Sequence, residues 1–172
     1  MLGSSLGKSV GELPTGTGTV AVTPLPALPS ELSIPRLGIA AEIEQVGLDQ
    51  DKAMDVPSQA QNVAWYMLGA VPGQKGNAVV AGHFDSKTGP AVFYKLNEMQ
   101  PGDKVAVTDA DGKNISFVVE RIETYPEADF PLQEVFGETQ EARLNLITCT
   151  GIYNLNSQNY SHRTVVYTVL DS

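Results

Sequence analysis

Short runs of apolar residues, separated by turn residues, recur along most of the chain. Many of these runs alternate apolar and polar side chains, which is the pattern of a β-strand with one face in a core. The run at 78–81 is apolar throughout, which is typical of a strand buried on both faces. The strands predicted in this way lie at 32–39, 42–48, 63–66, 78–81, 104–108, 115–125, 144–149 and 164–170.

Turn and helix signals complete this pattern. Pro35 interrupts the first strand, so we expect 32–39 to lie at the edge of a sheet. The link at 109–112 ends in Asp-Gly and predicts a hairpin between its two flanking strands. Helical turns are expected only near 93–99 and 132–136. Seven or eight short strands with so little helix predict an all-β fold, a closed or nearly closed barrel with short helical turns.

The first thirty residues differ in composition from the rest of the chain. Residues 3–19 are rich in Gly, Ser and Thr, and prolines recur through 24–29. Such stretches favour extended, weakly packing chain. We therefore expect a linker at 1–30 and one folded domain at 31–172.

Charge and hydropathy exclude some classes of protein. The formal net charge is -9, and the 11 basic residues are scattered singly, which argues against a nucleic-acid partner. No apolar run reaches the roughly 20 residues that span a bilayer. The amino terminus also lacks a basic segment followed by an apolar one. The chain as given is expected to be soluble, with any membrane anchor outside it.

Candidate chemistry centres on Cys149, the only cysteine, which can form no internal disulfide. By itself it fits either a buried structural thiol or a nucleophile. His83 follows one predicted strand, Cys149 ends another, and Arg163 opens the last. Imidazole can transfer a proton between thiol and amine, and a guanidinium can stabilise an oxyanion, so the three residue types suit acyl transfer through a thioester. Taken singly, His83 also fits a structural role and Arg163 a surface ion pair.

Resemblance to a known family connects the three residues. Residues 72–83, PGQKGNAVVAGH, resemble the sortase segment that ends in the catalytic histidine. Residues 146–149, LITC, resemble the sortase strand that ends in the nucleophile, and Arg163 matches the place of the sortase arginine. Residues 89–94 resemble the sequence that follows the histidine in class F and related sortases. The resemblance covers nearly all of 32–170.

The resemblance implies the closed eight-stranded sortase barrel and cleavage of an LPxTG-like sorting signal between Thr and Gly. It gives Cys149 the role of nucleophile, His83 that of proton-transfer partner, and Arg163 that of the cation at the substrate backbone or oxyanion. It implies no cofactor. Further residues are expected to bind the substrate, one beside the nucleophile and the others in the loop 125–141: Thr148, Phe130, Leu132, Val135 and Phe136. Thr148 equally fits a plain strand residue, and the loop residues equally fit a minor core.

Other polar residues near these motifs are expected to have no part in catalysis. His162 adjoins Arg163, so on a strand it would face the opposite side. Asp85 can orient His83, but a turn-capping role suits it better. Glu42 and Glu44 alternate on one strand and suggest a solvated face, so no metal site is expected. Residues 13–16, LPTG, resemble a shortened sorting signal, which chance also explains in such a linker.

The resemblance also implies partners and a location. The substrates would be sorting-signal peptides of secreted proteins and an amine acceptor, from a cell-wall precursor or a pilin lysine. The full-length protein would be extracytoplasmic and membrane-anchored. Two alternatives stay open on the sequence: a thiol hydrolase on the same barrel, and a non-catalytic β-barrel adhesion or assembly module.

Overall fold

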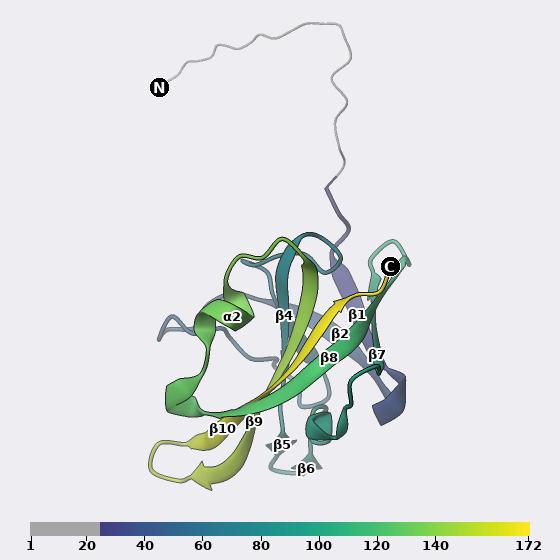
Figure 1. The fold of residues 1–172 in the computed structure, drawn as a ribbon. Helices are drawn as coiled ribbons and strands as arrows, with labels where there is room; N and C mark the ends of the chain where they lie inside the picture. The colour runs from purple at the N-terminus through teal and green to yellow at the C-terminus, as the bar shows by residue number, and fades with distance from the viewer. Residues whose placement is uncertain (1–24) are drawn as a thin grey trace, which may run out of the picture.

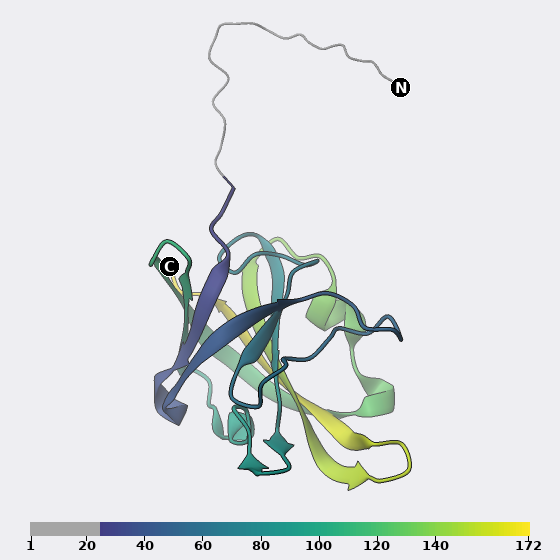
Figure 2. The ribbon, with the colours of Figure 1, turned by 180° about the vertical axis from the view of Figure 1, so that it is seen from behind.

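The computed structural model describes residues 25–172, and within them eight strands close into one barrel in the order β1-β2-β3-β4-β9-β10-β8-β7 (Figures 1 and 2). The barrel strands are β1 (Pro29–Ile34), β2 (Ile39–Val46), β3 (Val63–Tyr66), β4 (Gly76–Gly82), β7 (Lys104–Asp109), β8 (Asn114–Pro126), β9 (Ala142–Asn154) and β10 (Asn159–Leu170). The remaining elements are the small pair β5 (Asp85–Ser86) and β6 (Gly89–Pro90), the 3-10 turns η1 (Pro35–Leu37), η2 (Leu96–Glu98) and η3 (Glu127–Asp129), and the helix α2 (Leu132–Phe136).

The all-β closed barrel predicted from the sequence is confirmed, together with the hairpin of β7 and β8 and the helical turn at 132–136. Of the predicted linker, residues 1–24 lie outside the described residues, and so do residues 13–16, with their likeness to a sorting signal. The first strand begins at Pro29, just before the predicted domain boundary. Among the described residues, no helix combines the length and hydropathy needed to cross a bilayer.

The prediction of a single edge strand at 32–39 is wrong. Pro35 begins the 3-10 turn η1, and Gly38 follows with a left-handed φ of 67°, so the chain reverses there. Two strands result, β1 and β2, which pair with each other. β1 also pairs with β7, because closure of the barrel removes the edge that a proline usually marks.

Two strands at the functional end of the barrel are longer than predicted. β9 does not end at Cys149 but continues to Asn154, and β10 begins at Asn159, before Arg163. Residues 150–158 therefore form the tip of a long hairpin. Beyond the barrel rim this hairpin has no core to face, so its residues lack the apolar alternation that marks a strand in the sequence.

Strand alternation divides the apolar side chains into two clusters. The larger fills the barrel and includes Ala78, Val80 and Leu146. Val79, Val165 and Tyr167 alternate with such residues, so they lie on the outer face, where Val135 of α2 packs against them. The barrel wall formed by β4, β9 and β10 is therefore covered on the outside by α2 and its loop.

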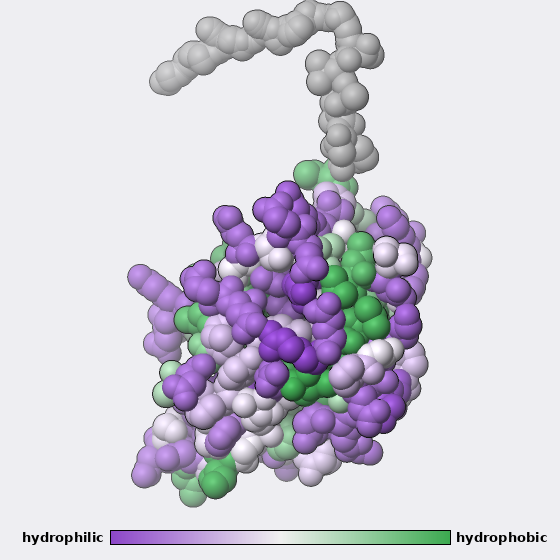
Figure 3. Space-filling view, in the orientation of Figure 1, coloured by the Kyte–Doolittle hydropathy of each residue, from purple (hydrophilic) through white to green (hydrophobic). Residues whose placement is uncertain are grey.

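The two ends of the barrel carry different features. The chain enters β1 and leaves β10 at one end, and the β9–β10 hairpin and the β5–β6 pair project from the other (Figures 1 and 2). At the hairpin tip, Ile152 and Leu155 are 79% and 83% exposed, and Figure 3 shows apolar atoms at this tip. His83 directly follows β4, Cys149 lies in β9 and Arg163 lies near the start of β10, so all three predicted catalytic residues lie toward this end.

Candidate active site

The hairpin register places Cys149 and Arg163 directly opposite each other. β9 and β10 pair antiparallel, and Cys149 of one strand is the partner of Arg163 of the other. Side chains at paired positions of neighbouring strands project to the same face. The antiparallel register therefore brings together two residues that lie 14 positions apart in the sequence.

His83 approaches the same place from the other side of β9. β4 runs parallel to β9, and their last pair is Ala81 with Ile147. One residue further along each strand, the Thr148 hydroxyl donates to the Gly82 carbonyl at 2.8 Å. His83 and Cys149 are the next residues along the two chains. The three predicted catalytic residues thus come from three adjacent strands, with Cys149 in the middle.

The surroundings of His83 are set by its backbone and by a distant loop. Its carbonyl accepts a hydrogen bond from the Phe93 amide at 3.0 Å, and its ring Nε2 lies 2.8 Å from the carbonyl oxygen of Pro57. Asp85 accepts a hydrogen bond from the Tyr160 hydroxyl. Within residues 25–172, the His83 ring therefore pairs with Pro57, and Asp85 pairs with the hairpin.

Four hydrogen bonds hold the guanidinium of Arg163. Nη1 donates to the backbone carbonyls of Tyr160 and His162, each at 3.0 Å. Nη2 donates to Asn159 Oδ1 at 2.9 Å and to Glu127 Oε2 at 3.0 Å. Within residues 25–172, this leaves the Nε–H as the donor without a protein partner. His162 has a separate contact, between its Nδ1 and the Ser161 hydroxyl at 2.6 Å.

The thiol of Cys149 is half-buried, and its charge state reflects three neighbouring influences. Burial raises the pKa of Cys149, the positive charge of Arg163 lowers it, and the carboxylate of Glu127 raises it, with a net increase over the ordinary value. At neutral pH the thiol is therefore mainly protonated, and the nucleophilic thiolate is a minority species.

The loop residues predicted to line a groove differ in where they lie. Val135 is fully buried against the outer barrel face, and Phe130 and Phe136 pack at its margin. Leu132 is 62% exposed. Thr148 is buried, with its hydroxyl committed to Gly82, so it joins the ends of β4 and β9. Contact of these five residues with a substrate stays a prediction.

The comparisons with known proteins agree with this geometry. The family model of the sortase domain matches residues 32–171, which is most of the chain and includes all three candidate catalytic residues. The chain belongs to the sortase family. Members of this family are cysteine transpeptidases, so the prediction of an enzyme of this kind is confirmed.

Solved sortase structures share the fold of this sortase. A lid mutant of sortase A from Corynebacterium diphtheriae superposes with a TM-score of 0.65 at 22% identity, covering 86% of this chain and 71% of that one. Sortase C1 from Streptococcus agalactiae gives 0.64 at 19% identity, covering 83% and 67%. A sortase D5 transpeptidase from Clostridium perfringens gives 0.62 at 20% identity, covering 85% and 79%. No curated protein sequence matches the chain.

Sequence reasoning missed the residues that support the sortase site. Pro57 contacts His83 through a backbone carbonyl, and a carbonyl has no signature in the sequence. Glu127 and Asn159 contact Arg163 from a turn and a hairpin whose positions depend on the closed barrel.

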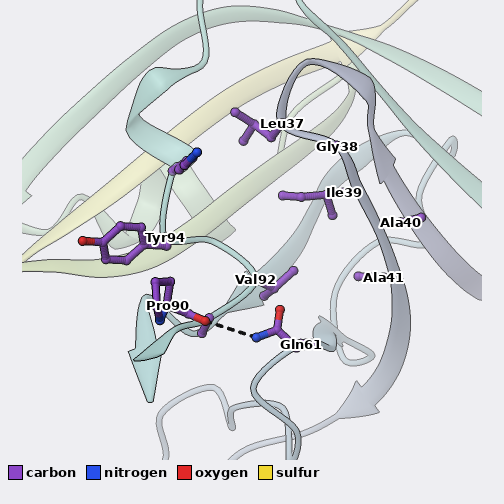
Figure 4. A pocket seen from close by; sticks show the side chains of 11 residues that line it. Leu37, Gly38, Ile39, Ala40, Ala41, Gln61, Pro90, Val92 and Tyr94 are labelled. Atoms are coloured by element: carbon purple, nitrogen blue, oxygen red, sulfur yellow. Dashed lines mark hydrogen bonds between the residues drawn. The ribbon is translucent and has the colours of Figure 1, made fainter. Parts of the chain in front are cut away.

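A hollow of about 400 Å³ lies beside the sortase site rather than in it (Figure 4). Its walls come from η1 and β2 on one side and from the segment 90–95 on the other, and none of the candidate catalytic residues lines it. Gln61 reaches across its lower edge and donates to the Pro90 carbonyl at 3.2 Å. This bond ties the loop between β2 and β3 to the segment that follows His83.

The two glutamates of β2 accept hydrogen bonds from the loop between β2 and β3. Glu44 accepts bonds from Ser58 and Asn62, and Glu42 accepts a longer one from Asn62. Within residues 25–172, no group of three or more His, Cys, Asp or Glu side chains is arranged to hold a metal ion.

Proposed function

We propose that this sortase cleaves an LPxTG-like sorting signal between Thr and Gly and transfers the acyl group to an amine. The observation that carries the proposal is the pairing of Cys149 with Arg163 across β9 and β10, beside the end of the strand that leads to His83. This arrangement combines a nucleophile, a fixed cation and a proton carrier at one end of the barrel.

The reaction proceeds in two balanced steps. In the first, His83 takes the proton from the Cys149 thiol, the sulfur bonds to the Thr carbonyl carbon, the Thr–Gly bond breaks, and His83 passes that proton to the departing Gly amine. A thioester is left on the enzyme. In the second, the acceptor amine attacks the thioester carbon, His83 takes up the amine proton, the bond from carbon to the Cys149 sulfur breaks, and His83 returns the proton to that sulfur.

Arg163 stabilises the negative charge on the carbonyl oxygen in both steps. Its Nη groups are occupied by Glu127, Asn159 and two backbone carbonyls. The Nε–H is the donor that can reach a substrate without breaking these bonds. A guanidinium held in this way needs little rearrangement when the oxyanion forms.

The groove for the signal lies on the outer face of the barrel beside α2. Phe130 and Phe136 contribute its margins, next to β9 and β10, and the buried Val135 supports them from below. Leu132 and Thr148 complete the predicted set of contacts. The aromatic and aliphatic character of this surface suits the Leu and Pro of the signal.

The substrates are sorting-signal peptides of secreted proteins, and the acceptor is a primary amine of a cell-wall precursor or of a pilin lysine. Such substrates meet the enzyme outside the cytoplasm. We therefore infer an extracytoplasmic protein held at the membrane by a segment outside the described residues.

A peptide assay tests the proposal. The protein is incubated with labelled Leu-Pro-x-Thr-Gly peptides, with and without a glycine-type amine, and the products and the intact enzyme are followed by mass spectrometry. We expect an acyl adduct on Cys149 and an aminolysis product when the amine is present. Cys149→Ala should abolish both, and His83→Ala and Arg163→Ala should each lower turnover at least about a hundredfold.

Two results would count against the proposal. Release of the free acid alone, with no aminolysis product at high amine concentration, would make the enzyme a thiol hydrolase. Absence of any Cys149-dependent cleavage across a library of signals would refute the assigned substrate class.

A further inference from the structure

The carbonyl of Pro57 decides which nitrogen of His83 carries a proton. A carbonyl oxygen only accepts hydrogen bonds, so the 2.8 Å contact requires a proton on Nε2. In the neutral ring, Nδ1 is then the nitrogen that can accept a proton. The position of one backbone carbonyl thus determines both the ring orientation and the nitrogen available for chemistry.

Pro57 belongs to the loop 47–62, and the Glu44 side chain accepts several hydrogen bonds from this loop. Glu44 of β2 accepts hydrogen bonds from the Ser58 amide at 2.9 Å, the Ser58 hydroxyl at 3.1 Å and the Gln59 amide at 3.4 Å. It accepts a fourth from Asn62 Nδ2 at 2.9 Å. Two of these bonds involve the backbone amides that come immediately after Pro57.

The other end of the loop is fixed independently. The Val92 amide donates to the Ala60 carbonyl at 3.0 Å, and Gln61 donates to the Pro90 carbonyl across the hollow of Figure 4. The segment 90–92 in turn follows His83, whose own carbonyl accepts from Phe93. Residues 60–61 are thus held by the chain after His83, while 58–59 depend on Glu44.

We propose that Glu44 is a positioning residue for the proposed transpeptidation, whose carboxylate holds residues 58–59 so that the Pro57 carbonyl fixes the ring of His83. This proposal rests on the proposed role of His83 in proton transfer. Glu44 itself acts only through the loop and does not take part in the chemistry.

The charge of Glu44 suits this role. Four donors from three residues converge on its two oxygens, and a carboxylate is the side chain that offers only acceptors. Partial burial opposes its ionisation, but the bonds from Ser58, Asn62 and Gln59 outweigh that effect and lower the pKa of Glu44. The loop therefore binds the ionised form. An amide at this position would turn an NH₂ group toward one set of donors.

Glu44→Gln tests the proposal, with Glu42→Gln as its matched control. Glu42 lies two residues away on the same strand, and within residues 25–172 its side chain accepts a single bond, at 3.3 Å from Asn62. Each substitution removes one negative charge and keeps the side-chain shape. Only the first removes the acceptors that hold the residues after Pro57.

The first readout is the Nε2–H signal of His83 in ¹H–¹⁵N spectra of the whole protein. We expect this signal to be present in the wild type and in Glu42→Gln, and to be lost through solvent exchange in Glu44→Gln. The second readout is peptide turnover. We expect kcat to fall about tenfold or more in Glu44→Gln with KM nearly unchanged, because a misplaced catalytic group slows chemistry more than binding.

The two readouts separate this proposal from the proposed function. Retention of the Nε2–H signal in Glu44→Gln, or equal loss in Glu42→Gln, would overturn the positioning role whatever the activity. An inactive wild type whose signal still responds as expected would refute the substrate and leave the positioning role in place. Should Glu44→Gln not fold, Glu44→Asp keeps the charge and withdraws it by one methylene, and an unchanged signal and kcat there would overturn the role.

Discussion

A buried amide attaches α2 to the barrel and provides a stringent test of the fold around the site. Asn145 of β9 is fully buried, and its Nδ2 donates to Asn77 Oδ1 at 3.0 Å and to the Val135 carbonyl at 2.9 Å. Asn77 Nδ2 in turn donates to the Gly137 carbonyl at 2.8 Å. These bonds join the short helix beside the proposed groove to β4 and β9.

Replacing Asn145 by Ala removes both donors and leaves two buried acceptors without them. A buried polar group that loses its partner costs about 1–3 kcal/mol, so two acceptors suggest roughly 3 kcal/mol. Part of this is offset, because Asn145 Oδ1 is itself buried with no partner among the described residues, and the substitution removes it. We therefore expect a loss of about 2 kcal/mol, which for a domain of this size lowers Tm by about 7 °C.

Urea and thermal unfolding measure this loss, with Asn114→Ala as the control. Asn114 is exposed at the start of β8 and makes one bond, at 3.4 Å to Thr108, so its substitution should change stability by less than about 0.5 kcal/mol. If Asn145→Ala loses no more than this control, the assigned network is wrong. A double-mutant cycle with Asn77→Ala should give a coupling energy of about 1 kcal/mol, because the two amides bond each other.

Two further predictions concern the site itself. Glu127→Gln removes a negative charge that raises the pKa of Cys149, so the midpoint of thiol alkylation should move to lower pH and the rate at pH 7 should rise. Glu138→Gln in the same loop should leave the pH profile of alkylation unchanged. Slower alkylation of Cys149 in Glu127→Gln would contradict the expected fall in the thiol pKa. Gly82→Ala should lower the free energy of unfolding, measured in urea, by about 2 kcal/mol or more and should slow peptide cleavage, because its Cβ would lie 2.6 Å from the buried ring of Phe93. A variant as stable as the wild type would show that the ring can move aside.

Much of this fold is encoded locally and was therefore open to prediction. The link at 109–112 predicts the hairpin of β7 and β8, because an Asp-Gly turn and two alternating flanks act over a few residues. The apolar runs at 78–81 and 144–149 predict strands for the same reason. Pro35 misled the prediction, since a proline marks an edge only where a sheet has one, and closure of the barrel depends on the whole chain.

The candidate site was likewise predictable only in part from the sequence. The motifs around His83 and Cys149 predicted the chemistry, because their resemblance to sortase motifs rests on short local stretches of sequence. Arg163 was also predicted from its place in the sequence, but its pairing with Cys149 follows from strand register. Pro57 and Glu127 were beyond reach, because they come from segments 26 and 36 residues away from the groups that they bind. The sequence by itself thus determined the reactive groups and most of the strands. Only the tertiary structure decided which carbonyl and carboxylate surround them and how the predicted cation is placed, since contacts between distant residues follow from barrel closure and register, which no local pattern specifies.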